Sequence, residues 1–101
     1  MNNNDEWAGL EALGRLLQVA RQDTGQARRV ASFLLAWHNA EENGGWDPVD
    51  LWNVDAVIAD DILTVVRLIR ESRQYPDALG FSEEIKAVWR LWRGDRSGAA
   101  S

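Results

Sequence analysis

Hydrophobic residues recur every three or four positions along most of the chain, which is the spacing of an amphipathic helix. The pattern predicts a first helix that begins after Asp5, a suitable N-cap, and ends at about Arg21. Its apolar stripe comprises Trp7, Leu10, Leu13, Leu16, Leu17 and Ala20. Gly9 and Gly14 are each expected to weaken this helix by about 1 kcal/mol relative to alanine.

A polar segment then predicts the start of a second helix. Asp23 and Gln26 have the spacing of a capping box, in which each side chain bonds to the backbone of the other residue. The helix is predicted to run to about Asn43, where Gly44 and Gly45 end it, because glycine adopts left-handed backbone without strain. Its apolar side comprises Ala27, Val30, Phe33, Leu34 and Trp37, with Glu41 next in register.

Asp47 and Pro48 form another start signal, an N-cap followed by proline at the first helical position. We expect a short helix to about Trp52 and a longer one from near Val54 to Ser72. The longer helix presents Val54, Ile58, Ile62, Val65 and Ile69 as its buried side, flanked by Val57, Val66 and Leu68. Its length and spacing favour a helix over a strand despite the β-branched residues.

The last helix is predicted from Glu83 to Arg93, with Ser82 as its cap and Gly94 at its end. Tyr75-Pro76 separates it from the preceding helix, because proline disfavours helical geometry in the residue before it. The side chains expected to be buried are Ile85, Val88, Trp89 and Trp92.

These elements predict an all-α fold, a compact bundle of four main helices plus one short helix. Residues 1–101 are expected to form one domain, with loose termini at 1–5 and 95–101. The chain has no cysteine, which excludes disulfides and thiolate metal sites and fits a reducing compartment. It has no run of about 18 apolar residues and its start is polar and acidic, so a cytoplasmic location is expected.

Charge is segregated along the chain. Residues 30–66 contain no lysine or arginine and carry a formal charge of −7, whereas the rest has 11 basic and 9 acidic residues, a charge of +2. The sum is the net charge of −5. The acidic residues of this segment are Glu41, Glu42, Asp47, Asp50, Asp55, Asp60 and Asp61.

Two interpretations of the acidic segment are open. The carboxylates can serve as helix caps, as a solvated face, or as partners of Arg67, Arg70 and Arg73 within the fold. Alternatively they form a continuous surface for a basic protein, because spaced carboxylates can occupy a groove meant for nucleic acid phosphates. The same charge disfavours direct binding to nucleic acid, although Arg28 and Arg29 add to a local basic stripe.

The six tryptophans fall into two groups. Trp7, Trp37, Trp89 and Trp92 lie on apolar helical sides and are predicted to be core residues. Trp46 and Trp52 flank the acidic turn, where they either close the end of the bundle or serve as exposed anchors for arginine. The candidate partner-binding set is therefore Glu41, Glu42, Trp46, Asp47, Asp50, Trp52, Asp55, Asp60 and Asp61.

No catalytic, cofactor or metal site is predicted. His38 is the only histidine, and with Glu41, Glu42 and the pair Asp60-Asp61 it could form part of a metal site. A di-iron bundle, however, needs two Glu-x-x-His units, which one histidine cannot supply. No Gly-x-Ser-x-Gly turn or phosphate-binding glycine loop accompanies it.

Several segments have a familiar combination of residues: ALGRLL at 12–17, DTGQ at 23–26, ASFLLAW at 31–37, GGWD at 44–47, DLW at 50–52, DD at 60–61 and YPD at 75–77. Together they resemble an uncharacterised family of small acidic proteins carried on integrative and conjugative elements and plasmids of proteobacteria, over about residues 10–92. The resemblance implies no activity. It implies a mobile-element accessory or counter-defence factor, such as an anti-CRISPR or anti-restriction inhibitor that acts stoichiometrically. A homodimeric structural subunit is the alternative.

Overall fold

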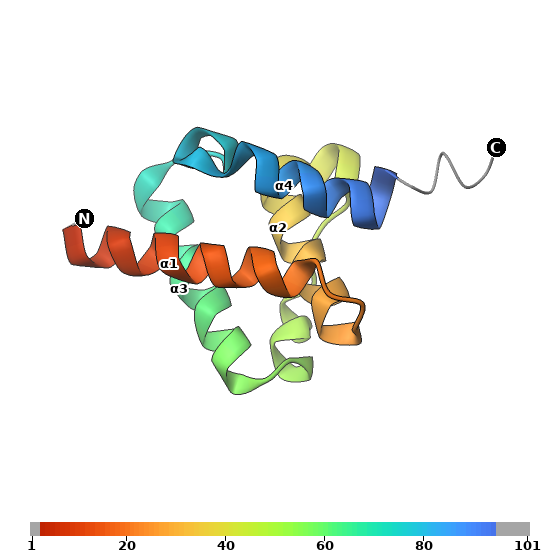
Figure 1. Cartoon of the computed structure of the whole chain (residues 1–101). Helices are drawn as coiled ribbons and strands as arrows, with labels where there is room; N and C mark the ends of the chain where they lie inside the picture. The colour runs from red at the N-terminus through yellow and green to blue at the C-terminus, as the bar shows by residue number, and fades with distance from the viewer. Residues whose placement is uncertain (1–2, 95–101) are drawn as a thin grey trace.

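The computed structural model describes residues 3–94, and over this range the chain is helical without a β-strand (Figure 1). The α-helices are α1 (Asn3–Ala20), α2 (Gly25–Asn43), α3 (Ala56–Ser72) and α4 (Ser82–Trp89). The shorter segments are the 3₁₀-helix η1 (Pro48–Asn53) and the π-helical turns η2 (Asp77–Phe81) and η3 (Arg90–Gly94). The predicted all-α bundle is confirmed. No helix in the described range is long and apolar enough to cross a membrane.

The predicted loose N-terminus is wrong for part of its length, because Asn3 to Asp5 already form the first turn of α1. Asp5 therefore lies inside the helix and is not its N-cap. Residues 1–2 and 95–101 lie outside the described range.

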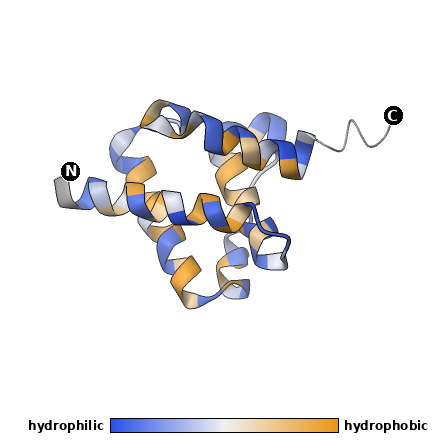
Figure 2. Ribbon diagram, in the orientation of Figure 1, coloured by the Kyte–Doolittle hydropathy of each residue, from blue (hydrophilic) through white to orange (hydrophobic). Residues whose placement is uncertain are grey.

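Helix α1 is the centre of the bundle and packs against α2, α3 and α4 (Figure 1). The apolar sides of the helices meet there, and Figure 2 shows hydrophobic residues recurring along the segments that face α1. The core is one cluster, whose buried members are Ala12, Leu13, Leu16, Leu17, Ala20, Val30, Ala31, Phe33, Leu34, Leu35, Ile62, Val65, Leu68, Ile85 and Val88.

Helices α1 and α3 cross at close range (Figure 1). A Cβ atom added at Gly9 would lie 3.0 Å from the Cβ of Leu68, so glycine is what permits this approach. Nearer the other end, Arg15 donates two hydrogen bonds of 2.9 Å to the carboxylate of Asp61. Gly9, which was expected only to weaken α1, therefore allows this helix to pack closely against α3.

The start of α2 differs from the predicted capping box. Thr24 is the N-cap, and its hydroxyl oxygen accepts a hydrogen bond of 3.0 Å from the backbone N–H of Ala27. Among the described residues, the Gln26 side chain does not bond back to Asp23. It accepts from the backbone N–H of Asp55 at 2.5 Å and donates to the Asp55 carboxylate at 3.2 Å. A long-range contact thus ties the start of α2 to the start of α3.

Helix α2 is kinked near its C-terminal end, where Asn39 has φ −167° and ψ 87°. The Asn39 side chain accepts a hydrogen bond of 3.2 Å from the backbone N–H of Glu42 and donates one of 3.1 Å to the Glu42 carboxylate. This is the reciprocal arrangement of an N-cap with a residue three positions later, so the last turn is capped separately. Gly44, with φ 94°, ends the helix as predicted.

The remaining helix starts agree only in part with prediction. Asp47 caps η1, since its carboxylate accepts a hydrogen bond of 3.0 Å from the backbone N–H of Val49. Ser82 is not the cap of α4. Phe81 holds that position, because the π-helical turn η2 leads directly into the helix through Gly80 at φ 97°.

Two of the four predicted core tryptophans are not in the core. Trp7 is 65% exposed, because α1 begins beyond the edge of the bundle (Figure 1), and Trp89 is 38% exposed. Trp37 and Trp92 are half-buried against the core as expected. Glu41, Val57 and Val66, placed on or beside apolar sides by the helical pattern, are exposed.

Candidate functional site

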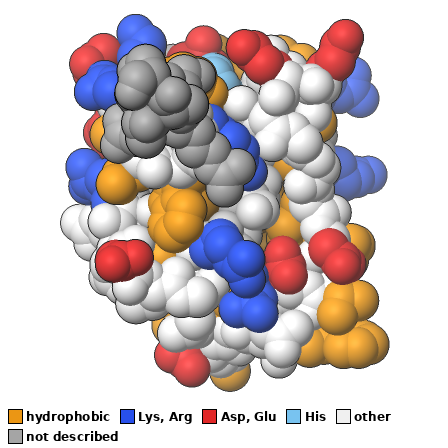
Figure 3. Space-filling view, turned by 90° about the vertical axis from the view of Figure 1, so that its right-hand side faces the viewer, with side chains coloured by type: hydrophobic (Ala, Val, Ile, Leu, Met, Phe, Trp, Pro, Cys, Tyr) orange, Lys and Arg blue, Asp and Glu red, His pale blue; other side chains and the backbone are white. Residues whose placement is uncertain are grey.

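The seven carboxylates of the acidic segment do not form one continuous surface. Asp50 and Asp55 contact the first turns of α2 through Arg29 and Gln26, whereas Glu41 lies on the last turn of that helix. Twelve helical steps separate residue 29 from residue 41, which correspond to about 18 Å of helix axis. On the face drawn in Figure 3, acidic side chains lie apart from one another, with basic ones among them.

Most of these carboxylates have partners inside the molecule. Asp47 caps η1, Asp55 bonds to Gln26, and Glu42 accepts from Asn39. Two more carboxylates form ion pairs, Asp61 with Arg15 at 2.9 Å and Asp50 with Arg29 at 3.6 Å. Neither pairs with the predicted arginines. Only the side chains of Glu41 and Asp60 lack such a partner among the described residues.

The pair between Arg15 and Asp61 is the strongest of these electrostatic contacts. The hydrogen bond to Asp61, and secondarily its charge, raise the pKa of Arg15 above its ordinary value. Because Asp61 is largely buried in this contact, with 13% of its side chain exposed, it is a link between α1 and α3. It is not an available surface carboxylate, contrary to its place in the predicted set.

The structure separates the two tryptophans that sequence could not assign. Trp46 is half-buried and packs edge-on against Phe33, with ring centroids 5.0 Å apart, so it closes the end of the bundle. Its indole Nε1 is buried without a hydrogen-bond partner among the described residues. Trp52, in η1, is 80% exposed. Of the two, Trp52 alone is exposed.

Exposed apolar and acidic residues lie on both sides of Trp52 in the sequence, where η1 leads into α3. Val49 is 41% and Val57 is 71% exposed, and the chain between them carries Trp52. Asp47 is the N-cap of η1, Asp55 is the N-cap of α3, and both are exposed. We call these five residues the Trp52 corner. It joins a large aromatic surface to carboxylates, which is the combination that binds an arginine side chain.

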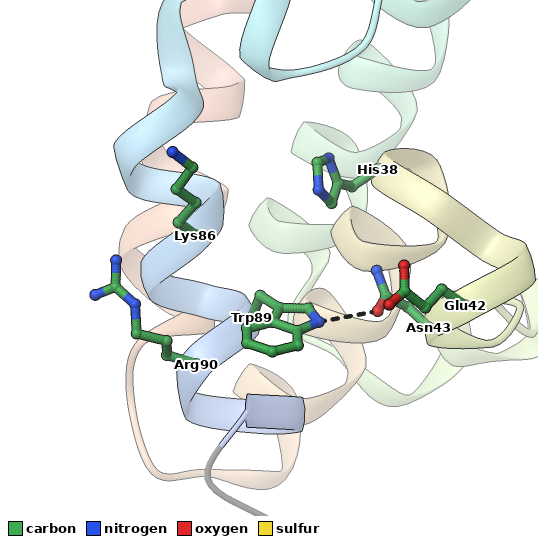
Figure 4. Close-up of a pocket in the computed structure, with 6 residues that line it drawn as sticks. All are labelled: His38, Glu42, Asn43, Lys86, Trp89 and Arg90. Atoms are coloured by element: carbon green, nitrogen blue, oxygen red, sulfur yellow. Dashed lines mark hydrogen bonds between the residues drawn. The ribbon is translucent and has the colours of Figure 1, made fainter. Parts of the chain in front are cut away.

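A second feature is the cleft between α2 and α4, with a volume of about 330 Å³ (Figure 4). Trp89 projects across it toward Asn43, while Lys86 and Arg90 point away from His38 and Glu42. The lining residues are His38, Glu42, Asn43, Lys86, Trp89 and Arg90. The charged groups therefore do not converge on a common point as they would around a small ligand.

Asn43 organises one end of this cleft. Its Nδ2 donates to the carbonyl oxygen of Leu35 at 3.1 Å, and its Oδ1 accepts from the indole N–H of Trp89 at 3.2 Å. Its own carbonyl oxygen accepts from Arg93 at 3.2 Å. In a straight helix Leu35 would lie about 12 Å away along the axis, so the kink makes this contact possible. The sequence pattern predicted Asn43 only as a helix end. The spacing of Asn39 and Glu42, which is typical of a capped helix start, was the signal that could have indicated the kink.

His38 lies at the edge of the cleft and faces Asp77. Its Nδ1 lies 4.0 Å from the Asp77 carboxylate, and the cleft lining contains no serine, threonine or cysteine. Asp61 bonds to Arg15 instead of joining His38. Within residues 3–94, no group of three or more His, Asp or Glu side chains is arranged to hold a metal ion.

The described residues thus form a compact all-helical domain in which Trp52, at the corner between η1 and α3, is the most exposed tryptophan. The chain belongs to a family of unknown function, DUF7673, whose model matches residues 10–93. This confirms the expectation of an uncharacterised family over nearly the predicted span. No curated protein shows significant similarity to the chain, and no solved structure does.

Proposed function

We propose that this protein is a non-catalytic binding module that recognises a basic protein through the Trp52 corner. The observation that carries the proposal is Trp52 itself, which is 80% exposed, whereas Trp37, Trp46 and Trp92 pack against the core. Tryptophan is favoured at the centres of protein interfaces because it combines a large contact area with one hydrogen-bond donor. An exposed tryptophan between valines is therefore best explained by a partner.

The charges near Trp52 favour a basic partner. Asp47 and Asp55 are exposed at the starts of η1 and α3, and Asp50 is only partly neutralised by Arg29 at 3.6 Å. An arginine of the partner can stack on the indole ring while it pairs with a carboxylate. Glu41 and Glu42 lie too far along α2 to take part, and Trp46 and Asp61 serve the fold. The binding set is thus narrower than the sequence predicted.

The setting that we propose follows the resemblance of the sequence segments. A mobile-element protein in the cytoplasm that binds a basic, nucleic-acid-binding protein would act as an accessory or counter-defence factor, including an anti-CRISPR or anti-restriction inhibitor. Such an inhibitor acts stoichiometrically, by occupying the surface that nucleic acid phosphates would otherwise contact. The acidic Trp52 corner supports this mode of action.

A peptide titration tests the proposal. The affinity of a fluorescently labelled, arginine-rich peptide is measured by anisotropy for the wild type and for Trp52→Ala, which we expect to bind about tenfold more weakly. Trp7→Ala is the matched control, because Trp7 is also exposed but lies at the opposite end of the α1–α3 pair. Equal affinity of the wild type and Trp52→Ala would reject the Trp52 corner as the binding surface.

A further inference from the structure

The outward side of α3 carries apolar and charged groups that the bundle leaves without partners. Leu63 is 53% exposed, between the exposed residues Asp60 and Arg67. Neither charged side chain has an ion-pair partner among the described residues. Helical spacing places these residues on one stripe, whose members are Ala56, Asp60, Leu63, Thr64, Arg67 and Glu71.

This stripe is complementary to itself. Asp60 and Arg67 are about 10 Å apart along the axis, with Leu63 and Thr64 midway between them. When a second α3 lies antiparallel on the same stripe, Asp60 of one copy faces Arg67 of the partner subunit. Two-fold symmetry then repeats the contact at the other end, as an isologous interface requires.

A hollow beside Leu63 gives the stripe a place for an apolar side chain. Its volume is about 340 Å³, and it is lined by Asp5, Ala8, Leu63, Thr64 and Arg67 from α1 and α3. In the antiparallel arrangement, Leu63 of the partner subunit lies next to Thr64 and so reaches this hollow. A leucine at the centre, with an ion pair on each side, has the composition of a small symmetric interface.

We propose that the protein forms a two-fold dimer through α3, in which Asp60 of each copy pairs with Arg67 of the other around Leu63. A second copy fits this surface better than the basic partner of the Trp52 corner, because the stripe has a carboxylate on one side of Leu63 and a guanidinium on the other. Two antiparallel stripes therefore bring opposite charges together. The inference does not depend on the proposed function. It concerns different residues, and Trp52→Ala is expected to remain a dimer.

Charge exchange tests this interface, with molecular mass measured by sedimentation equilibrium. The wild type is expected to dimerise, whereas Asp60→Arg and Arg67→Asp should each weaken the dimer at least about tenfold, because like charges then face each other. An equal mixture of the two single variants should dimerise again, because one chain presents two cations and the other two carboxylates. This recovery also shows that both variants are folded.

The matched control is Glu41→Arg, which makes the same change of charge as Asp60→Arg at an exposed carboxylate on α2. It should leave the dimer unchanged. A wild type that stays monomeric from micromolar to millimolar concentration would overturn the proposal. So would single variants that dimerise as well as the wild type, or a mixture that behaves like its separate components.

Discussion

At the scale of single residues, polar side chains join parts of the chain that are far apart in sequence. Gln26 bonds to Asp55, Arg15 bonds to Asp61, and Asn43 bonds to Trp89. Gln26, Asp61 and Asn43 had other roles in the sequence-based prediction, as a cap, a surface charge and a helix end. Periodicity detects which side of a helix is apolar, but it contains no information on which polar groups meet across the bundle.

Asn43 should be the polar residue on which stability depends most. Asn43→Ala leaves the carbonyl of Leu35 and the indole N–H of Trp89 without their protein partners, so we expect the free energy of unfolding to fall by about 2 kcal/mol. Urea denaturation followed by circular dichroism measures this change. Asn53→Ala is the control, because Asn53 is exposed and makes only one long hydrogen bond of 3.4 Å. Equal losses in the two variants would contradict the role given to Asn43.

At the scale of elements, the sequence predicted the helices well and their ends less well. The extents of α2, η1 and α3 agree with prediction within about two residues, since their apolar spacing is regular and Asp47-Pro48 and Gly44 are strong signals. The caps at Asp5, Asp23 and Ser82 were wrong. At each of them a neighbouring residue or a longer helix took the position, which local propensity alone cannot decide.

The two glycines of α1 should respond to alanine in opposite directions. Gly9→Ala places a Cβ atom 3.0 Å from Leu68, so we expect a loss of about 1–3 kcal/mol in the free energy of unfolding as α1 and α3 are forced apart. Gly14→Ala meets no atom within 4 Å and should gain about 1 kcal/mol from helix propensity. Thermal and urea denaturation of both variants measure the difference. A gain at Gly9 would show that the α1–α3 contact is looser than described.

At the scale of the whole molecule, the segregation of charge along the sequence is not preserved in space. Glu41 and Glu42 lie in the last turn of α2, Asp50 and Asp55 contact its first turns, and Asp60 and Asp61 lie on α3. Sequence could identify the charges but not this separation, because it depends on the path of residues 44–55 around the bundle. The choice between Trp46 and Trp52 was likewise beyond the sequence, since it is decided by the contact of Trp46 with Phe33.

The exposed side chains that remain define two independent surfaces on one small domain. The Trp52 corner is acidic and aromatic, and suits a basic partner. The outer side of α3 has Asp60 on one side of Leu63 and Arg67 on the other, and suits a second copy in antiparallel orientation. A dimer would present two Trp52 corners to its partner, which increases the effective concentration of binding sites.

The most direct test of the Trp52 corner follows the six indole N–H resonances of the ¹⁵N-labelled protein during titration with an unlabelled arginine-rich peptide. We predict that the Trp52 resonance shifts most and saturates with the binding curve, while those of Trp7 and the half-buried Trp46 change little. Asp47→Asn and Asp55→Asn together should reduce the Trp52 shift at the same peptide concentration. A Trp52 resonance that stays fixed while other indoles shift would contradict the proposed binding surface.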